Sequence, residues 1–448
     1  MVFCETAKKG GRLNSSNCFT FNIKFQQVKN IFSLIILLAL CFISNAQETR
    51  YYISADRLFD GNSMQKNWAV IIDHDRIIDV GPKDKLKPPP GAIIIDKPNA
   101  TILPGLIEGH SHLFLYPYNI TDWDTQVLKE TDAYRTVRAT VHARNTLMAG
   151  FTTSRDMGTE GAGYADVALK RAINEGIIPG PRLLVAGRAI VATGSYGPKG
   201  YDEDSKIMLG AEPADGADLI RVVRDQIGKG ADFIKVYADY RWGPDGEDRP
   251  TFSIEEMKTI YETAASSGRP FVAHAKTREA IRRAVLAGAE TIEHGDFLDS
   301  ATARLMKEHH VTYIPTIAAV EMISQYRGWI KGKTPEPERV TLKKKSFRDA
   351  LASGVTIGMG GDVGVFAHGE NVMEMELMTE YGMKPIDVLK AATSVNAKAF
   401  HLDNIVGSIK AGLKADIIIV EGNPAENISS LRKVLLVMKD GKVYRDEK

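Results

Sequence analysis

Cysteine is scarce in this 448-residue sequence, and its three cysteines, Cys4, Cys18 and Cys41, all lie within the first 41 residues. The long remainder of the chain therefore excludes a disulfide framework, a thiolate metal site and a cysteine nucleophile. Any metal ion bound there must take nitrogen and oxygen ligands.

An excess of charge of one sign is also missing. The 57 lysines and arginines nearly balance the 56 aspartates and glutamates, which gives a formal net charge of +1. Nucleic acids and anionic membrane surfaces attract proteins through basic patches, so we expect neither as a partner. A content of 44% hydrophobic and 25% charged residues is ordinary for a folded protein. We predict a small molecule as the partner.

No apolar run is long enough to cross a membrane. The longest, residues 31–43, is shorter than the roughly 18 to 20 residues that a membrane-spanning helix needs. Two lysines precede it and small residues follow it up to Ala46, which is typical of a secretory signal peptide. We predict a signal peptide over residues 1–46, cleaved after Ala46, and a periplasmic or secreted mature chain without a membrane span. A buried or membrane-anchoring N-terminal helix is the alternative.

Both ends of the remaining chain have the pattern of short β-strands. Segments such as "NWAVIIDHDRIIDVG" and "KADIIIVEGNP" are rich in β-branched residues and are separated by Gly, Pro and Asn turn signals. Neither end is large enough to close a core alone. We therefore predict one small β-sandwich domain formed from residues 47–102 and 405–448.

Between these ends, over residues 103–404, short apolar runs alternate with amphipathic segments. Eight runs can be distinguished: "ILPGLIEGH", "GFTTSRDMG", "RLLVAGRAI", "ADFIKVYAD", "PFVAHAKT", "AETIEHGD", "VTYIPTIA" and "VTIGMGGDV". Connectors such as "EEMKTIYETAASSG" have apolar residues at helical spacing and end in glycine. Eight β-then-α units predict an α/β fold, a (β/α)8 TIM-type barrel. A doubly wound open sheet is the competing architecture, but no glycine-rich phosphate motif opens the first unit.

Two long polar loops interrupt this alternation, at residues 187–216 and 240–252, after the third and fourth runs. In a barrel, loops after the carboxyl ends of strands surround the active site. They are candidate lids or specificity walls, with surface loops of no function as the alternative.

Polar side chains end several of the eight runs. Two residues that follow each other at i and i+2 on a strand face the same side, which places the two imidazoles of a His-x-His within reach of one ion. Imidazole nitrogen and carboxylate oxygen suit zinc and neighbouring divalent metals. A lone histidine would more often be a packed or surface residue, but carboxyl ends of barrel strands converge. The run-ending residues are His110, His112, Lys235, His274, His294 and Asp362.

Lys235 does not fit a metal site in its ordinary form. A protonated ammonium has three donors and no lone pair for a cation. Carbon dioxide can add to a deprotonated lysine, however, and the two carbamate oxygens can each bind one metal. The alternative is a lysine whose side chain extends from the strand end to water.

Five segments, "GHSH", "FIKVY", "VAHA", "IEHGD" and "MGGD", occur in an order that resembles the amidohydrolase superfamily over nearly all of the mature chain. The segment "AGFTTSRDMG" and the region from "LKAATSVNAKAF" onward resemble its imidazolonepropionase-like branch. That branch contains metal-dependent Xaa-Pro dipeptidases and carboxypeptidases, and the fungal ochratoxin amidase is related to it. Imidazolonepropionase itself has one metal and lacks the lysine, so Lys235 favours the binuclear amidases.

The resemblance implies two divalent metal ions, by preference zinc, joined by N6-carboxylated Lys235. One ion is expected on His110, His112 and Asp362, and the other on His274 and His294. A hydroxide bridging the metals would attack the carbonyl, and Asp362 would accept its proton and pass it to the leaving amine. We predict an exported enzyme that cleaves amide bonds of dipeptides or N-acyl amino acids. The alternative is a lactone or phosphotriester hydrolase with the same centre.

Substrate contacts are less clearly marked. Tyr237, two residues after Lys235, and His142, before the second run, are candidates, with simple packing as the alternative. Lys276, two residues after His274, is a candidate to meet an anionic group. Arg155 is expected to be a structural partner of nearby carboxylates such as Asp156. The resemblance also implies a homo-oligomer.

Overall fold

The computed structural model describes residues 50–447 except 203, 205, 206 and 208. The predicted signal peptide therefore lies outside the described residues. Within the described part of the chain, no helix is long and apolar enough to span a bilayer.

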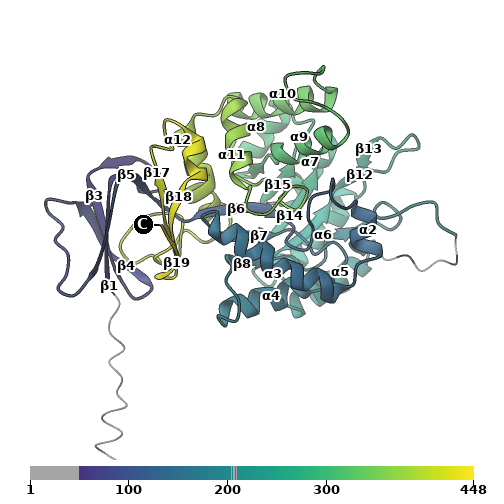
Figure 1. The fold of residues 1–448 in the computed structure, drawn as a ribbon. Coiled ribbons are helices and arrows are strands. Elements are labelled where there is room, and N and C mark those ends of the chain that lie inside the picture. Colours follow the sequence, from purple (N-terminus) through teal and green to yellow (C-terminus); the bar gives the residue numbers. More distant parts are fainter. Residues whose placement is uncertain (1–49, 203, 205–206, 208, 448) are drawn as a thin grey trace, which may run out of the picture. The chain divides into compact units, whose positions relative to one another are not determined.

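Strands from both ends of this region form one mixed sheet, in which the purple and yellow strands of Figure 1 lie together. Its order is β19-β18-β17-β5-β1-β3-β4, and β2 pairs with β1. The two ends meet where β5 lies parallel to β1 and antiparallel to β17, with Ile102 opposite Ile419. The strands are β1 (Arg50–Phe59), β2 (Met64–Lys66), β3 (Trp68–Asp73), β4 (Arg76–Pro82), β5 (Ile93–Pro104), β17 (Ile417–Glu421), β18 (Val434–Lys439) and β19 (Lys442–Asp446).

This sheet encloses a hydrophobic core of its own. The buried cluster contains Ile77 of the edge strand β4 as well as Leu436 and Met438 of β18, near the other edge. Strands near opposite edges of a sheet can share one core only if the sheet folds over, so that its two ends face each other as in a sandwich. The predicted β-sandwich domain from both chain ends is confirmed.

Seven of the eight predicted barrel runs contain regular strands, paired in parallel within two groups, β6-β7-β8 and β11-β14-β15-β16. Between the groups, the Asp232 amide donates to the Val185 carbonyl at 2.8 Å. These strands are β6 (Leu106–Ser111), β7 (Phe151–Asp156), β8 (Arg182–Val185), β11 (Ile234–Tyr237), β14 (Phe271–Ala275), β15 (Thr291–His294) and β16 (Thr312–Ile314).

The eighth run closes the circle without forming a regular strand. Ile357 makes a single parallel bridge to Tyr313, and the Gly109 amide donates to the Met359 carbonyl at 3.1 Å. The eight segments thus follow one another around a (β/α)8 barrel, as predicted.

Glycine explains the irregularity of this eighth segment. A Cβ on Gly360 would lie 2.6 Å from Ile314 Cγ2 and 2.8 Å from the His110 nitrogen. A Cβ on Gly358 would lie 2.3 Å from Asn396 Oδ1. The segment therefore approaches both neighbouring strands more closely than a residue with a side chain permits, which brings Asp362 near His110.

Gly360→Ala should lower the free energy of unfolding by about 1–3 kcal/mol, because the added methyl group overpacks the junction. Denaturant unfolding measures the change. Gly81→Ala in β4 is the matched control, since no atom of the described residues lies within 4 Å of its Cβ position, and it should be neutral or slightly stabilising. Equal losses in both variants would contradict the steric explanation.

Helices alternate with the barrel strands, and local sequence signals explain their ends. Ser253 and Glu256 form a reciprocal capping box at the start of α6, and α7 ends at Gly288 with φ +104°. The helices are α2 (Trp123–Leu128), α3 (Asp132–Met148), α4 (Ala165–Asn174), α5 (Asp218–Gly228), α6 (Ile254–Ala265), α7 (Arg278–Ala287), α8 (Ser300–Glu308), α9 (Ile317–Tyr326), α10 (Glu338–Ser353), α11 (Val372–Glu380), α12 (Pro385–Lys390) and α13 (Asn396–Ala399), with a π-helical turn η1 (Ala391–Val395) and a 3-10 turn η2 (Ile428–Arg432).

The two long loops both contain short strands. The first forms β9 (Ile190–Val191) and β10 (Glu212–Pro213), and β9 pairs with β11 through Ile190 and Val236. The second forms a hairpin of β12 (Asp239–Arg241) and β13 (Asp248–Pro250). Both loops therefore begin and fold beside the carboxyl ends of barrel strands.

Candidate active site

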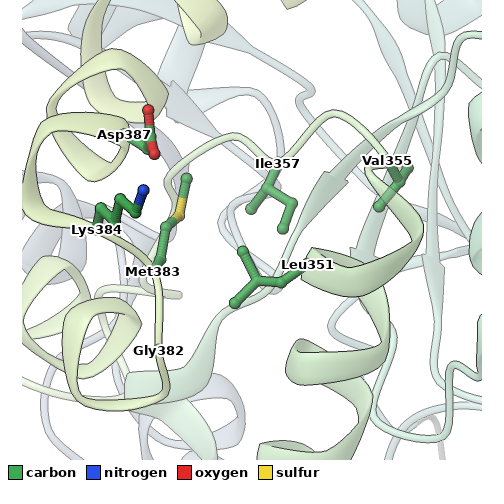
Figure 2. Close-up of a pocket in the computed structure, with 7 residues that line it drawn as sticks. All are labelled: Leu351, Val355, Ile357, Gly382, Met383, Lys384 and Asp387. Carbon is green, nitrogen blue, oxygen red and sulfur yellow. The ribbon is translucent and has the colours of Figure 1, made fainter.

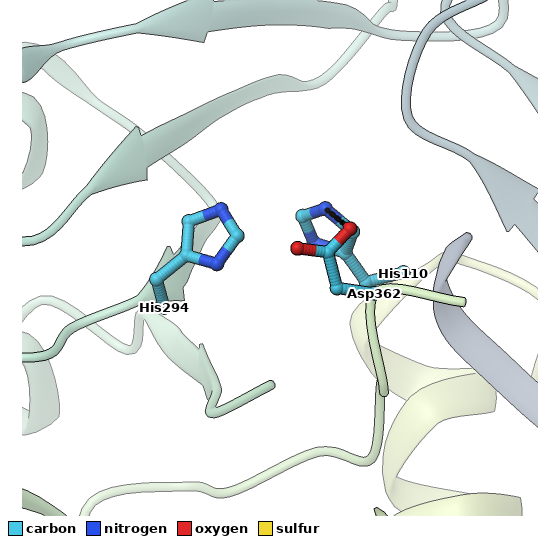
Figure 3. A group of neighbouring side chains, drawn as sticks. All are labelled: His110, His294 and Asp362. Carbon is cyan, nitrogen blue, oxygen red and sulfur yellow. Dashed lines mark ion pairs between the residues drawn. The ribbon is translucent and has the colours of Figure 1, made fainter. Parts of the chain in front are cut away.

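The predicted run-ending residues come together at the carboxyl ends of the strands. One side-chain atom from each of His110, His294 and Asp362 lies within 4.8 Å of the other two. Figure 3 shows His294 pointing toward the other two side chains from the opposite side. His112 Nε2 lies 3.6 Å from Asp362 Oδ1, and the ring of His274 is centred 4.3 Å from that of His294.

Three nitrogens in this cluster are buried without any hydrogen-bond partner in the described part of the chain: His110 Nε2, His274 Nε2 and Lys235 Nζ. An unsatisfied buried polar group costs about 1–3 kcal/mol, so native proteins seldom leave several together. Divalent cations satisfy such nitrogens directly. The residues present therefore fit a metal centre.

The hydrogen bonds and the lowered pKa values of the imidazoles leave ring nitrogens whose lone pairs can bind a metal. His110 Nδ1 donates to Glu293 Oε2 and His112 Nδ1 donates to the Gly158 carbonyl, both at 2.8 Å. Their Nε2 atoms are left with lone pairs on the Asp362 side. Burial, followed by the charge on Lys235, lowers the pKa of His110 to about 4, and burial also lowers the pKa of His274 well below its usual value. Neutral rings are the form that binds metals.

Lys235 lies on β11 and is fully buried. Burial lowers the pKa of its ammonium to about 8, although the carboxylates of Glu293 and Asp362 oppose this shift. Its nitrogen is also 5.4 Å from the centre of the Tyr237 ring. The structure thus places Lys235 with the histidines rather than in water.

Glu293 orients His110 within the cluster, and the sequence motifs did not identify it as a site residue. It accepts hydrogen bonds from His110 Nδ1 and from Arg155 Nη2, both at 2.8 Å. Burial raises the pKa of Glu293, but Arg155 and His110 outweigh it and lower the pKa to about 2. Carboxylates that hold the second nitrogen of a ligand histidine fix its tautomer and its direction.

Glu293→Gln should weaken the affinity for an added divalent cation by about 10- to 100-fold, because the amide holds His110 less firmly and leaves Arg155 without its charge partner. Chelator competition with apo-protein measures the affinity. Glu290→Gln is the control, since Glu290 is partly exposed and pairs with His401 outside the cluster. An unchanged affinity in the Glu293 variant would argue against an orienting role.

Two site residues have left-handed backbone angles, His294 at φ +74° and Asp362 at φ +63°. Thr316, whose hydroxyl is 2.8 Å from His294 Nδ1, also has a positive φ of +48°. Such conformations cost about 1–3 kcal/mol each and persist where surrounding contacts impose them. They turn the chain at the strand ends so that these side chains face the cluster.

The predicted substrate contacts lie at different depths. Tyr237 stacks on His274 with ring centres 4.5 Å apart, so it borders the cluster directly. Lys276 forms an ion pair with Asp248 of the β12–β13 hairpin. His142 is packed against His368, and its Nδ1 donates to the Leu113 carbonyl at 2.7 Å. All three substrate roles stay predictions.

Both long loops add tyrosines beside the cluster. Tyr196 of the first loop lies 4.6 Å from Tyr237 between ring centres, and Tyr240 of the second loop lies 6.4 Å from His274. The buried carboxylate of Glu160 accepts from the hydroxyls of Tyr196 and Tyr237 at 2.5 and 3.1 Å. The loops therefore form an aromatic wall of the site, consistent with the predicted specificity walls.

A separate pocket of about 300 Å³ lies elsewhere on the barrel (Figure 2). It includes Val355 and Ile357, which precede Asp362 on the eighth segment, so it lies toward the amino end of that segment. In barrels the catalytic face is at the carboxyl ends. This pocket also lacks histidines and has only one lysine and one aspartate. Its lining residues are Leu351, Val355, Ile357, Gly382, Met383, Lys384 and Asp387.

A (β/α)8 barrel with neutral imidazoles, a carboxylate and a buried lysine at its carboxyl face defines a metal-dependent hydrolase as the class of protein. The Amidohydrolase family matches residues 101–444. The chain belongs to the amidohydrolase family and is a hydrolase of amide or peptide bonds. The resemblance read from the sequence motifs is confirmed.

Individual relatives agree with this assignment. Ochratoxinase from Aspergillus niger is 30% identical over 374 residues, which cover 77% of this chain and 75% of the relative. A solved structure of an Xaa-Pro dipeptidase with bound methionine is 32% identical and has a TM-score of 0.78. The alignment covers 89% of this chain and 100% of the dipeptidase chain. The solved A. niger ochratoxinase is 27% identical, with coverage of 89% and 96% and a TM-score of 0.76.

Proposed function

We propose that this amidohydrolase holds two divalent metal ions, by preference zinc, and cleaves the amide bonds of dipeptides or N-acyl amino acids. One ion would be held by His110, His112 and Asp362, and the other by His274 and His294. Carboxylated Lys235 would connect them. The similarity to an Xaa-Pro dipeptidase and to ochratoxinase supports this substrate class.

The main support for the proposal is the environment of the Lys235 nitrogen. Its nitrogen is fully buried and has no hydrogen-bond partner among the described residues, and its charge acts on His110 and His274, whose Nε2 atoms likewise have no partner there. A buried ammonium in that position would be repelled by any cation that the histidines bind. Carboxylation converts the same nitrogen into a carbamate with two anionic oxygens, which suits a second metal.

When bound, the metal ions would lower the pKa of water and polarise the scissile carbonyl. Asp362, whose Oδ1 is 3.7 Å from His110 Nε2 and 3.6 Å from His112 Nε2, is placed to accept the proton from the attacking water. The same carboxyl would then protonate the leaving amine, which cannot depart readily as an anion. Tyr237 and the other tyrosines of the wall would shield this exchange from bulk water.

A hydrolysis screen tests the substrate class. Zinc-loaded protein, prepared with bicarbonate, should cleave some Xaa-Pro, Xaa-basic or N-acyl-aromatic amino acids and should contain about two metals per chain. Cleavage of lactones or phosphotriesters without any amide would establish the alternative hydrolase. A metal content near one ion per chain, together with full activity, would contradict the binuclear centre.

We also propose that the chain is exported. Lysines, an apolar run and small residues succeed one another before Gln47. The protein recovered from the periplasm or the medium should begin at Gln47, as determined by N-terminal sequencing. An uncleaved chain that stays inside the cell would contradict export.

A homo-oligomer is proposed for the assembled enzyme. Tyr134, Val137 and Val141 are 48–67% exposed and lie at i, i+3 and i+7 on α3, which places three apolar side chains on one helix face. Such a face is typical of a contact surface. Light scattering of the purified protein determines the number of chains.

A further inference from the structure

A second fully buried lysine, Lys343 of α10, lies close to the active site but does not face the metal ligands. Its ammonium donates to the backbone carbonyl of His294 and, at 2.9 Å, to Asp296 Oδ1. It also lies 3.5 Å from the hydroxyl of Tyr313. A helix outside the barrel thus reaches the turn that follows β15.

That turn has an unfavourable backbone. His294 and Gly295 are left-handed in succession, at φ +74° and +58°. Left-handed angles are uncommon for residues with a side chain and need contacts that impose them. The Tyr313 hydroxyl donates to the same His294 carbonyl at 2.8 Å, so two donors fix the peptide that follows His294.

The two buried lysines differ in what surrounds their nitrogens. Within the described part of the chain, Lys235 Nζ has no hydrogen-bond partner, whereas Lys343 Nζ has a carboxylate and a carbonyl within reach. Lys343 is therefore a fixed cation inside an ion pair with Asp296, and a second cation, Arg339, lies 3.6 Å from the other oxygen of that carboxylate. Both cations hold the segment immediately after His294.

We propose that Lys343 is a positioning residue for the metal centre. By holding the His294 carbonyl and Asp296, it keeps the His294 backbone in the angle that aims the imidazole at the cluster, while Thr316 sets the rotation of the ring. This role rests on the proposed function, in which His294 binds a metal. It predicts a loss of metal affinity beyond any loss of general stability.

Lys343→Met tests the role, because it keeps most of the side-chain volume and removes the donor. Apo-protein is titrated with zinc against a chelator, and unfolding temperatures are measured with and without zinc. We expect zinc affinity to fall by about 10- to 100-fold and the zinc-dependent rise in unfolding temperature to shrink. Arg339 remains beside Asp296, which favours folding of the variant. Lys439→Met is the matched control, since Lys439, the last residue of β18, is 5% exposed and its ammonium lies 3.7 Å from the carboxylate of Asp440.

Tyr313→Phe is the second variant, because it removes one hydroxyl donor from the same carbonyl and leaves the charges intact. It should weaken zinc binding by a smaller factor. If the Lys343 variant does not fold, this variant tests whether the donors to the His294 carbonyl support metal binding. Zinc affinities within twofold of the unchanged protein in every folded variant would overturn the proposal. An unchanged protein that binds no zinc would instead overturn the proposed function, and the inference with it.

Discussion

Lys235→Ala should abolish hydrolysis and lower the metal content of the purified protein. The substitution removes the nitrogen that would carry the carbamate, so the histidines would lose an anionic bridge between two mutually repelling cations. Metal ions supply several kcal/mol of barrier lowering, and each 1.36 kcal/mol is tenfold in rate, so we expect a loss of about three orders of magnitude or more. Elemental analysis and steady-state kinetics measure the two effects.

Carboxylation itself can be separated from metal loss. Protein that is reconstituted with zinc and ¹³C-labelled bicarbonate should show a carbamate carbon signal that is missing from the Lys235 variant. Lys439→Ala controls for the removal of a buried lysine and should keep both the signal and the activity. Full activity in the Lys235 variant, or activity independent of bicarbonate with no carbamate signal, would mean that the lysine is a packing residue.

Much of the site was predictable because the chemistry lies at strand ends. A buried parallel strand is a continuous apolar run, and its carboxyl end is the first place where a polar side chain can follow. His110, His274 and His294 lie in the last two positions of regular strands, whereas Lys235 is the second of the four residues of β11. Their assembly in space then follows from the barrel, without knowledge of any side-chain contact.

The eighth segment shows where this reasoning failed. "VTIGMGGDV" was predicted as a strand from its apolar start, but in the described part of the chain it forms two isolated parallel bridges, Ile357 to Tyr313 and Val363 to Ser111, and no regular strand. The glycines serve close packing, since Gly360 lies against the backbone of His110. Apolar content alone cannot distinguish a strand from a tightly packed connection, because the deciding distances involve residues from elsewhere in the chain.

Arg155 shows the second limit. Its neighbour Asp156 was the expected partner, yet successive residues of a strand point to opposite faces. Arg155 pairs with Glu293 across the barrel, whereas Asp156 accepts from the amide of Leu113 at 3.0 Å. The structural role predicted for Arg155 holds, but the carboxylate differs. Partners that lie far apart in the sequence leave no local pattern, as with Arg155 and Glu293, which are 138 residues apart, and Asp296 and Lys343, which are 47 residues apart.

Asp362→Asn should reduce kcat by about 10²- to 10⁴-fold, because the amide cannot accept a proton and cannot deliver one to the leaving amine. The amide keeps the size of the side chain and one oxygen toward His110 and His112, so we expect the protein to stay folded and to retain metal. Kinetics and elemental analysis are measured on the same preparations. Asp387→Asn, in the pocket of Figure 2, is the control and should leave kcat within twofold.

The leaving group then separates proton transfer from metal binding. An alkyl amine must be protonated before it departs, whereas a nitroanilide departs with little assistance. If Asp362 delivers the proton, its loss should depress hydrolysis of a dipeptide far more than hydrolysis of the corresponding nitroanilide. If Asp362 served only to hold the metal, both substrates would lose activity by the same factor together with metal content. The ratio of the two losses is therefore the quantity that decides whether Asp362 takes part in the chemistry.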